Sequence, residues 1–256
     1  MTDPAKLVGS DRVLAVLLEL AEHPNGITLD ELAKRLDSAK PTVHRALASL
    51  RRAGLANQSA RGVYELGDEF MRLAFRHQDA RPETARIEPL LRELAATYGE
   101  TAHYAILDGH DIVYRAKVDP PAGAMRLTST VGGRNKSHST AVGKLLLSYE
   151  LTTAAQLAEW IGDEPLARLT DTTIVDPGLF LAELQATRER GYGADDQENE
   201  VGVNCVAVSV EGGRLGAISV SGIAHRRGLA SLVAVVPEIR ATIERHLGSA
   251  KTSKIV

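Results

Sequence analysis

The chain has 256 residues and a formal net charge of −3, with 44% hydrophobic and 25% charged residues. This length allows one or two domains with buried cores, and the composition is ordinary for a soluble globular protein. The net charge does not point to nucleic acid or to an acidic membrane surface, so such a partner must be argued from local charge. The single cysteine, Cys205, excludes an intrachain disulfide and fits a reducing compartment.

The longest early apolar run, "VLAVLLELA" at residues 13–21, contains a glutamate and is too short to cross a bilayer. It also lacks the small-residue cleavage site of a signal peptide. We interpret it as part of an amphipathic helix over residues 10–22, capped by Ser10 or Asp11, in a cytoplasmic protein. A second helix follows, because Thr28 and Glu31 have the spacing of a capping box.

The stretch "SAKPTVHRALASLRRAGL" at residues 38–55 predicts a third helix. Ser38 is its expected cap, Pro41 falls in its first turn and Gly54 follows its end. Next, "LANQ-SARG-VYEL" predicts two strands around a glycine-containing turn. Three helices and a hairpin within residues 1–66 are the layout of a winged helix-turn-helix domain.

The exposed face of the third helix carries basic and hydroxyl groups, and residues 38–64 contain no Asp or Glu. Positive charge without opposing carboxylates suits a phosphate backbone. Arg45, near the helix N-terminus, can donate two hydrogen bonds to guanine in a major groove. Thr42 and His44 can reach phosphates or base edges, and Arg61 sits at the hairpin tip. The candidate DNA contacts are Lys40, Thr42, His44, Arg45, Ser49, Arg52 and Arg61; the alternative is a solvated basic face.

Residues 67–81 predict a linker helix whose Phe70, Leu73 and Phe75 are apolar enough to meet a second subunit. Residues 82–250 then predict a second domain, followed by a flexible tail at residues 251–256. Helices are expected near residues 87–98, from Ser139, at 177–191 and at 229–247, with Pro89 kinking or starting the first. Hairpins are expected at residues 101–118, with an Asp-Gly turn, and at 204–222. Antiparallel hairpins segregated from helices indicate an α+β fold.

Alternation in the second hairpin places Cys205, Ala207 and Ser209 on one sheet face. Ser219 and Ser221 likewise share a face, opposite apolar neighbours that supply core. Small polar side chains leave space for a small polar ligand. The helix N-terminus at residues 139–141 favours an anion, so a small carboxylate is a reasonable guest. The alternative is a solvent-facing side of the sheet.

Other chemistries have weaker support in the sequence. A nucleophilic Cys205 needs a base, and His103 or His138 would serve only if the fold brought one near. His138, Asp195 and Cys205 lack the short spacing of metal ligands. No phosphate-binding glycine fingerprint is present. We therefore expect no enzymatic activity, no metal and no cofactor.

Three segments resemble the IclR family of bacterial transcriptional regulators: "KPTVHRALASLRRAGL", "SHSTAVGKLLLS" and "RGYGADDQENEVGVNCVAVSV…GAISVSG". The resemblance implies a winged helix-turn-helix joined by a linker helix to a GAF-like effector-binding domain. It also implies homodimers or homotetramers on a partly palindromic operator, and effectors that are small organic or aromatic acids. The effector contacts that it implies are Thr140, Ala141, Asp195, Cys205, Ser219 and Ser221. Pro41 and the short "EGG" turn depart from the family pattern.

We therefore predict a transcriptional regulator whose binding to double-stranded operator DNA is modulated by a small carboxylic or aromatic acid. Two alternatives stay open: a ligand-binding or protein-interaction module without sequence-specific DNA binding, and a Cys205-dependent enzyme. The sequence does not identify the effector, the operator, the sign of regulation or the choice between dimer and tetramer.

Overall fold

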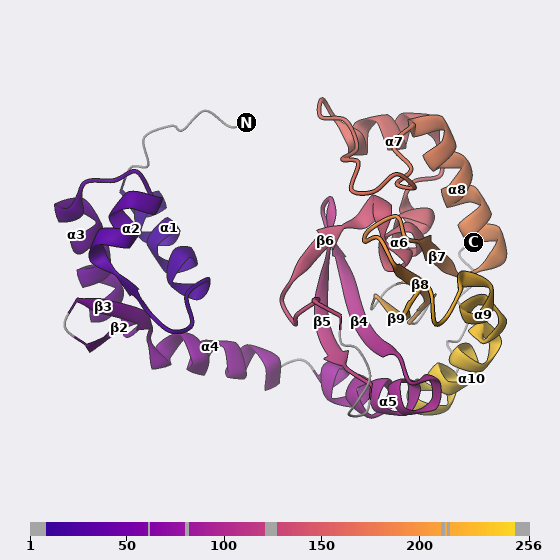
Figure 1. The fold of residues 1–256 in the computed structure, drawn as a ribbon, viewed down its shortest axis with the longest axis horizontal. Coiled ribbons are helices and arrows are strands. Elements are labelled where there is room, and N and C mark those ends of the chain that lie inside the picture. The colour runs from indigo at the N-terminus through magenta and orange to yellow at the C-terminus, as the bar shows by residue number, and fades with distance from the viewer. Residues whose placement is uncertain are drawn as a thin grey trace. The chain divides into compact units, whose positions relative to one another are not determined.

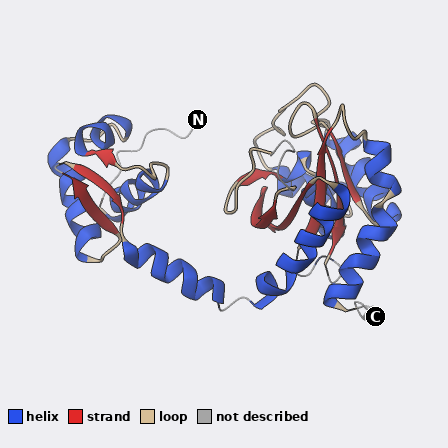
Figure 2. Cartoon of the chain, turned by 60° about the horizontal axis from the view of Figure 1, so that its bottom comes forward, coloured by secondary structure: helices blue, strands red, loops and turns tan. Residues whose placement is uncertain are grey.

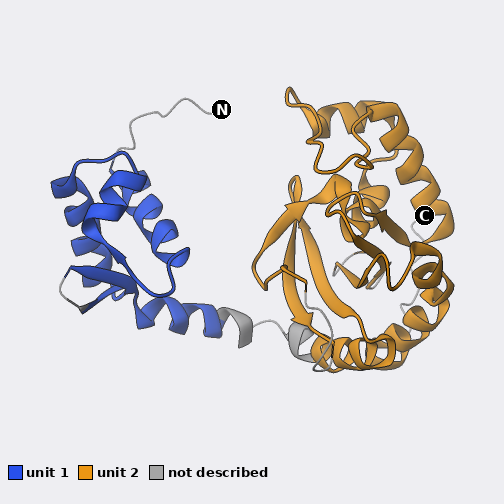
Figure 3. Ribbon diagram, viewed as in Figure 1, with its two compact units in different colours: residues 1–82 blue, residues 83–256 orange. Residues whose placement is uncertain are grey.

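The computed structural model describes residues 9–60, 62–79, 82–120, 127–210, 213 and 216–248. The chain divides into two compact units, residues 1–82 and residues 83–256 (Figure 3). Arg61 and the expected tail at residues 251–256 lie outside the described residues. In the described part of the chain, no helix has the length and apolar character needed to cross a membrane.

The first unit is a three-helix domain with a small antiparallel sheet, followed by a further helix (Figure 1). The sheet order is β1-β3-β2, so β1 pairs with the expected hairpin, an element that the sequence did not predict. The elements are α1 (Ser10–Ala21), β1 (Ile27–Thr28), α2 (Leu29–Arg35), α3 (Lys40–Arg52), β2 (Ala56–Ala60), β3 (Val63–Leu66) and α4 (Asp68–Asp79). The predicted winged helix-turn-helix arrangement and linker helix are present.

The helix ends of this unit test the predicted caps. The capping box of α2 is confirmed, because the Glu31 N–H donates to Thr28 Oγ1 at 3.2 Å and the Thr28 N–H donates to Glu31 Oε2 at 3.0 Å. Gly54 follows α3 with φ of 72°, as expected for a left-handed residue after a helix. The predicted Ser38 cap is wrong: Ala39 precedes the helix, and the Ser38 hydroxyl donates to the Leu36 carbonyl instead.

The cap of α1 also differs from the prediction. Gly9 holds the capping position and makes no side-chain hydrogen bond, while Ser10 and Asp11 lie inside the first turn. An acidic side chain there still favours the helix through the macrodipole. The expected apolar stripes of α1, α2 and α3 meet in one core. Its buried residues include Val16, Leu20, Leu32, Val43, Ala46, Leu47 and Leu50.

The second unit is built on a six-stranded antiparallel sheet of order β6-β5-β4-β9-β8-β7. The central pairing of β4 with β9 joins the two predicted hairpins, so segments far apart in sequence become neighbours. The edge strands β6 and β7 were not predicted. The strands are β4 (Thr101–Asp108), β5 (Asp111–Val118), β6 (Arg134–Lys136), β7 (Gly193–Asp196), β8 (Val203–Ser209) and β9 (Ala217–Ile223).

The two faces of this sheet have different partners. One face packs on α5 (Pro82–Tyr98), α9 (Leu229–Ala234) and α10 (Val236–Leu247), seen beside the sheet in Figures 1 and 2. Its apolar side chains include Val206, Val208, Ile218 and Val220. The opposite face carries Ala207 and Ala217 and packs on α6 (Ala141–Glu150). The predicted alternation is therefore confirmed, with the small residues turned away from the main core.

Several helix predictions need correction. The helix expected at residues 229–247 is two helices, with Val235 between α9 and α10. Ser139 does not open α6: it closes a 3₁₀ turn, η1 (Ser137–Ser139), and Thr140 is the cap. Helix α7 (Ala154–Ile161) was not predicted. Helix α8 (Pro177–Arg190) ends at Gly191 as expected, and Pro89 lies within a continuous α5.

Candidate functional site

The exposed face of α3 is the first candidate site, and it lies in the first unit. His44, Arg45 and Arg52 are exposed, while Thr42 and Ser49 are half-buried beside them. The apolar side of the helix is fully packed, so the hydroxyl and guanidinium groups cannot turn inward. This face is the one that the sequence predicted, and its role in DNA contact stays a prediction. Arg61 lies outside the described residues.

Hydrogen bonds within α3 arrange its guanidinium groups. Arg45 Nη2 approaches Thr42 Oγ1 at 3.4 Å, and Arg52 Nη2 donates to Ser49 Oγ at 3.0 Å. The Ser49 hydroxyl in turn donates to the carbonyl of Arg45. These contacts keep both guanidinium groups along one side of the helix, where they are spaced by two turns.

Lys40 has a partner that the local sequence window did not reveal. Its Nζ lies 2.8 Å from Asp30 Oδ2, a carboxylate on α2, and both side chains are exposed. The stretch of residues 38–64 contains no acidic residue, but the fold brings one from the preceding helix. Lys40 therefore contributes less uncompensated positive charge than Arg45 or Arg52.

The second candidate site is a cavity of about 650 Å³ in the second unit. It opens between the sheet face that carries the small residues and the start of α6. All six residues that the family resemblance implied line this cavity: Thr140, Ala141, Asp195, Cys205, Ser219 and Ser221. Residues as far apart in the chain as His103 and Ser221 meet there. Their contact with an effector stays a prediction.

The start of α6 forms one wall of the cavity. Thr140 Oγ1 accepts the N–H of Gly143 at 3.1 Å. Ala141 and Val142 supply the other backbone N–H donors of the first turn, which have no carbonyl partner within the helix. Thr140, Ala141 and Val142 all line the cavity. Gly143 lets the chain pack tightly here, because a Cβ on it would lie 2.1 Å from the Ser137 carbonyl oxygen. The wall can thus present backbone donors and the positive end of the helix dipole to an anion.

Hydroxyls and a buried imidazole form another wall. His103 is only 2% exposed, and its Nε2 lies 2.8 Å from Ser129 Oγ while its Nδ1 lies 3.5 Å from Ser219 Oγ. Burial, followed by the nearby Lys117 charge, lowers the pKa of His103 to about 3. The ring is therefore neutral and works as a hydrogen-bonding group. Lys117 Nζ donates to the Leu127 and Ser129 carbonyls at 2.8 and 2.7 Å, which holds that segment beside the cavity.

Tyr114 adds an aromatic surface to the same cavity. Its ring lies 4.8 Å from that of His103, and its hydroxyl accepts a hydrogen bond from Asn135 Nδ2 at 3.1 Å. Burial raises the pKa of Tyr114, so the phenol is neutral at physiological pH. Tyr114 and Asn135 were not among the residues predicted from the sequence. Their period-2 positions on strands were the available signal, but nothing local marked that face as the cavity side.

The cavity environment does not activate Cys205. Burial raises the pKa of the thiol well above its ordinary value, and the Asp195 carboxyl raises it further. An activated cysteine needs the opposite, a stabilised thiolate. His138, one of the two bases considered, has its Nε2 2.9 Å from the Ala167 carbonyl instead. Within the described residues, no group of three or more His, Cys, Asp or Glu is arranged to hold a metal ion.

Asp195 lies at the end of β7 and is 1% exposed. Its Oδ1 accepts the N–H groups of Glu198 at 2.7 Å and Asn199 at 3.4 Å. It is paired in register with Cys205 on β8. Burial raises the pKa of Asp195 to about 7, against the opposing effect of the two backbone donors.

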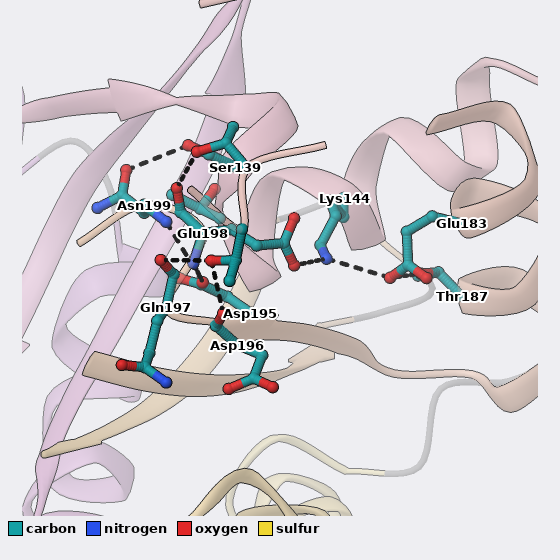
Figure 4. Close-up of polar contacts among 12 residues, drawn as sticks. Ser139, Lys144, Glu183, Thr187, Asp195, Asp196, Gln197, Glu198 and Asn199 are labelled. Carbon is teal, nitrogen blue, oxygen red and sulfur yellow. Dashed lines mark hydrogen bonds and ion pairs between the residues drawn. The ribbon is translucent and has the colours of Figure 1, made fainter. Parts of the chain in front are cut away.

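Behind Asp195 lies a buried charge cluster formed by Lys144, Glu198 and Glu183 (Figure 4). Lys144 on α6 is 2% exposed, and its Nζ lies between the two carboxylates, 2.5 Å from Glu198 Oε1 and 3.1 Å from Glu183 Oε1. Arg190 also pairs with Glu183 at 2.7 Å. Burial raises the pKa of Glu198, and Lys144 opposes that rise. The cluster links α6, α8 and the loop that follows β7.

A threonine-rich loop holds the segment after β7 from the other side. Thr170 Oγ1 donates to the Gln197 carbonyl at 2.7 Å, and Thr173 Oγ1 donates to the Glu198 carbonyl at 2.7 Å. Gln197 itself has φ of 60°, a conformation uncommon outside glycine. Ser139 Oγ contacts Asn199 Oδ1 at 3.2 Å. The position of Asp195 in the cavity is therefore fixed from several elements.

A winged helix-turn-helix domain with a basic helix face, joined to a second domain with a half-open cavity, is the arrangement of ligand-responsive transcription factors. Comparison with known families agrees. The family described as "IclR helix-turn-helix domain" matches residues 10–60, and "Bacterial transcriptional regulator IclR C-terminal" matches residues 81–245.

Individual relatives point the same way. The HTH-type transcriptional regulator BhcR of Paracoccus denitrificans is 34% identical over 233 residues, covering 88% of this chain and 81% of the relative. The crystal structure of an IclR transcriptional regulator from Alicyclobacillus acidocaldarius superposes with a TM-score of 0.76 at 24% identity, covering 92% of this chain and 96% of that one.

A third match concerns the second unit. It is the inducer-binding domain of a double mutant of the PobR transcription factor from Acinetobacter, in complex with 3-hydroxybenzoic acid. It is 32% identical with a TM-score of 0.57, covering 64% of this chain and 95% of that one. The chain belongs to the IclR family of bacterial transcriptional regulators. It is a DNA-binding regulator with a C-terminal ligand-binding domain, and its relatives are regulators rather than enzymes.

Proposed function

We propose that a small organic acid binds the cavity of the second unit and thereby changes the affinity of the protein for its operator. The observation that carries this proposal is that the first turn of α6, at Ala141 and Val142, lines the same cavity as the hydroxyls of Ser219 and Ser221. A carboxylate suits such donors and the helix dipole. The relative that holds 3-hydroxybenzoic acid supports an acid as the ligand class.

In this proposal the carboxylate of the acid faces the first turn of α6. Ser219 and Ser221 on β9 hydrogen-bond its other polar groups. Tyr114 and the aliphatic part of the wall pack against its apolar part. An aromatic acid would use all three surfaces, whereas a short aliphatic acid would leave part of the 650 Å³ cavity to water.

DNA recognition belongs to the α3 face. Arg45 would contact a guanine, Arg52 and Ser49 the backbone phosphates, and His44 and Thr42 either group. We propose that the protein acts as a homodimer or homotetramer in the cytoplasm. A dimer would place two α3 helices in successive major grooves, about 34 Å apart. The exposed Leu73 and Phe75 on α4 are suitable apolar contacts for a second subunit.

For the effector to regulate, it must bind one arrangement of the subunits more tightly than the other. The two steps can be tested in sequence with the full chain. A thermal-shift panel of acetate, pyruvate, benzoate and 3-hydroxybenzoate identifies acids that stabilise the protein. Fluorescence anisotropy with DNA from upstream of its own gene then measures the operator affinity with and without the best acid.

A change in operator affinity of fivefold or more, at constant ionic strength, supports the proposal. Stabilisation by an acid without any change in DNA affinity contradicts regulation. The Ser219→Ala and Ser221→Ala double variant is the matched control, because it alters the cavity while the α3 face is left intact. An identical response in that variant removes the two hydroxyls from the site.

A further inference from the structure

Asp195 is a carboxyl buried inside the cavity for which we propose an anionic ligand. An ionised carboxylate there would repel the carboxylate of the effector. It is 1% exposed, and Oδ1 accepts two backbone N–H groups, the second at the long distance of 3.4 Å. Among the described residues, no Lys, Arg or His side chain forms a hydrogen bond or ion pair with it.

The groups that face Asp195 come from every neighbouring element. Lys144 approaches from α6, Cys205 from β8 and Tyr114 from β5, while Glu198 and Glu200 lie on its own loop and Asp196 is its exposed neighbour. The thiol and the phenol are both neutral, because burial raises the pKa of each. Lys144 is therefore the one described cation among these groups. Arg134 and Lys136 also line the cavity, but both pair with carboxylates of β4 and β5, Asp108 and Asp111.

Lys144 is already engaged. Its ammonium group contacts the carboxylates of Glu198 and Glu183, and Figure 4 shows it pointing between them, with Asp195 beyond Glu198. With Arg190 included, this region holds two cations, Lys144 and Arg190, and three carboxyl groups, those of Glu183, Glu198 and Asp195. An ionised Asp195 would leave one uncompensated buried charge, which is costly. The proton that relieves this cost is best placed on Asp195, because it has no cation partner.

We propose that Asp195 recognises the effector as a neutral carboxylic acid, donating a hydrogen bond to the effector carboxylate, and that binding takes up one proton from solvent. This inference rests on the proposed function, since it concerns the same cavity. The balance is simple: an anionic effector and one proton enter together, and the cavity gains no net charge. In the free protein, the pKa of Asp195 near 7 makes the residue partly protonated at physiological pH.

The sign of the pH dependence follows. Below pH 7 Asp195 is mostly neutral and the cavity accepts a carboxylate; above pH 7 it is mostly ionised and repels it. Because only the protonated form is competent, the apparent dissociation constant equals the intrinsic dissociation constant divided by the protonated fraction. For a pKa of about 7, that fraction falls by roughly tenfold between pH 6 and pH 8. Carboxylate affinity is expected to fall by about the same factor.

A titration of the free protein tests the protonation state without any effector. The full chain is labelled with ¹³C at the Asp carboxyl carbons, and the signals are followed from pH 4 to 9. One signal is expected to titrate near neutral pH, to vanish in Asp195→Asn and to persist in Asp196→Asn, the matched exposed control. If every Asp signal titrates below pH 5, the inference is overturned, whatever the effector is.

Binding measurements test the coupling. Dissociation constants of benzoate, 3-hydroxybenzoate, acetate and pyruvate are measured at pH 6 and pH 8 for the wild type and both variants. We expect about tenfold weaker binding at pH 8 for the wild type and Asp196→Asn, and no pH dependence for Asp195→Asn, whose amide is a permanent neutral donor. Proton uptake by the wild type, measured in two buffers of different ionisation enthalpy, gives the same test if Asp195→Asn does not fold.

The outcomes separate this inference from the proposed function. Carboxylate binding with equal affinity at both pH values overturns the proton coupling but leaves the acid as effector. A pH dependence that survives in Asp195→Asn also overturns it, because the proton then resides elsewhere. If none of the four acids binds the wild type at pH 6, the proposed ligand class fails, and the coupling fails with it.

Discussion

The α3 face and the second-unit cavity use similar residue types in opposite electrostatic settings. On α3, Arg45 and Arg52 are exposed, and within the described residues their guanidinium groups hydrogen-bond to the neighbouring hydroxyls of Thr42 and Ser49. In the second unit, Lys144 is buried beside Asp195, and its ammonium group forms ion pairs with the carboxylates of Glu183 and Glu198. The first arrangement keeps positive charge available for a polyanion at the surface. In the proposed binding mode, hydroxyls, backbone donors and one proton bind the small ligand, because Arg134 and Lys136, which also line the cavity, pair with Asp108 and Asp111.

The two sites therefore obtain their specificity in different ways. A surface of free cations attracts any nucleic acid and is sensitive to salt, so only a few base contacts provide selectivity. The cavity of the second unit, where Lys144 is already paired with Glu198 and Glu183, would select its ligand by shape and hydrogen bonding.

Replacing the buried cation should have the largest consequence. Lys144→Met leaves Glu198 and Glu183 with less compensation in a buried region, so the free energy of unfolding of the second unit should fall by about 3–5 kcal/mol. Urea unfolding followed by the fluorescence of Trp160, the single tryptophan of the chain, reports on that unit. Lys136→Met, which removes an exposed pair with Asp111, is the control and should cost less than about 1 kcal/mol. Equal costs for the two variants would contradict the importance of the buried cluster.

Removing an exposed guanidinium should affect DNA alone. Arg45→Ala is expected to weaken operator binding by about 1–3 kcal/mol and to relax base preference, as for a bidentate base contact. Anisotropy titrations at fixed salt measure the loss, and a carboxylate thermal shift checks that the cavity is unaffected. Wild-type affinity in Arg45→Ala would remove this side chain from the DNA interface.

Removing cavity hydroxyls should affect the effector alone. Each hydrogen bond of Ser219 and Ser221 is expected to contribute about 0.5–1.5 kcal/mol, so the double alanine variant should need roughly five- to 150-fold more acid for half-maximal response. Its affinity for DNA without effector should match the wild type. A dose-response curve identical to that of the wild type would show that these hydroxyls do not bind the acid.

The smallest effect on DNA affinity is expected from removing the Asp30 carboxylate that pairs with Lys40 on the α3 face. Asp30→Ala frees Lys40 and should tighten DNA binding by less than tenfold while making its salt dependence steeper. Protein stability should change by less than about 1 kcal/mol, because the pair is exposed. Binding isotherms at several salt concentrations measure both quantities. A weaker interaction with DNA would mean that Asp30 orients Lys40 usefully rather than neutralising it.

Local sequence patterns predicted the features of the fold that depend on residues close together in the sequence. The Thr28–Glu31 capping box, the end of α3 at Gly54 and the alternation around Ser219 were all predictable because each involves residues within a few positions of one another. The predicted cap at Ser38 was wrong because α3 begins at Lys40, which makes Ala39 the capping residue and leaves Ser38 outside the helix. The single helix predicted over residues 229–247 was wrong because α9 and α10, which Val235 separates, both have apolar residues at helical spacing and so look like one helix in the sequence.

The charge balance of the cavity was not predictable in this way. Lys144 and Glu198 are 54 positions apart, and nothing in "AVGKLLLS" marks that lysine as buried. The pairing of Lys40 with Asp30 likewise depends on how α2 packs beside α3. The family resemblance named Asp195, but its protonation depends on partners that only the fold brings together.

The central claim is that the α3 face reads DNA while the cavity of the other unit regulates that reading. The most direct measurement is the affinity of the wild type for the DNA upstream of its own gene against a scrambled duplex of equal length, at physiological ionic strength, with and without the acid that gives the largest thermal shift. We predict a preference of about a thousandfold or more for the upstream DNA in one of the two conditions, changed by the acid. Equal affinity for both duplexes in both conditions would contradict the claim.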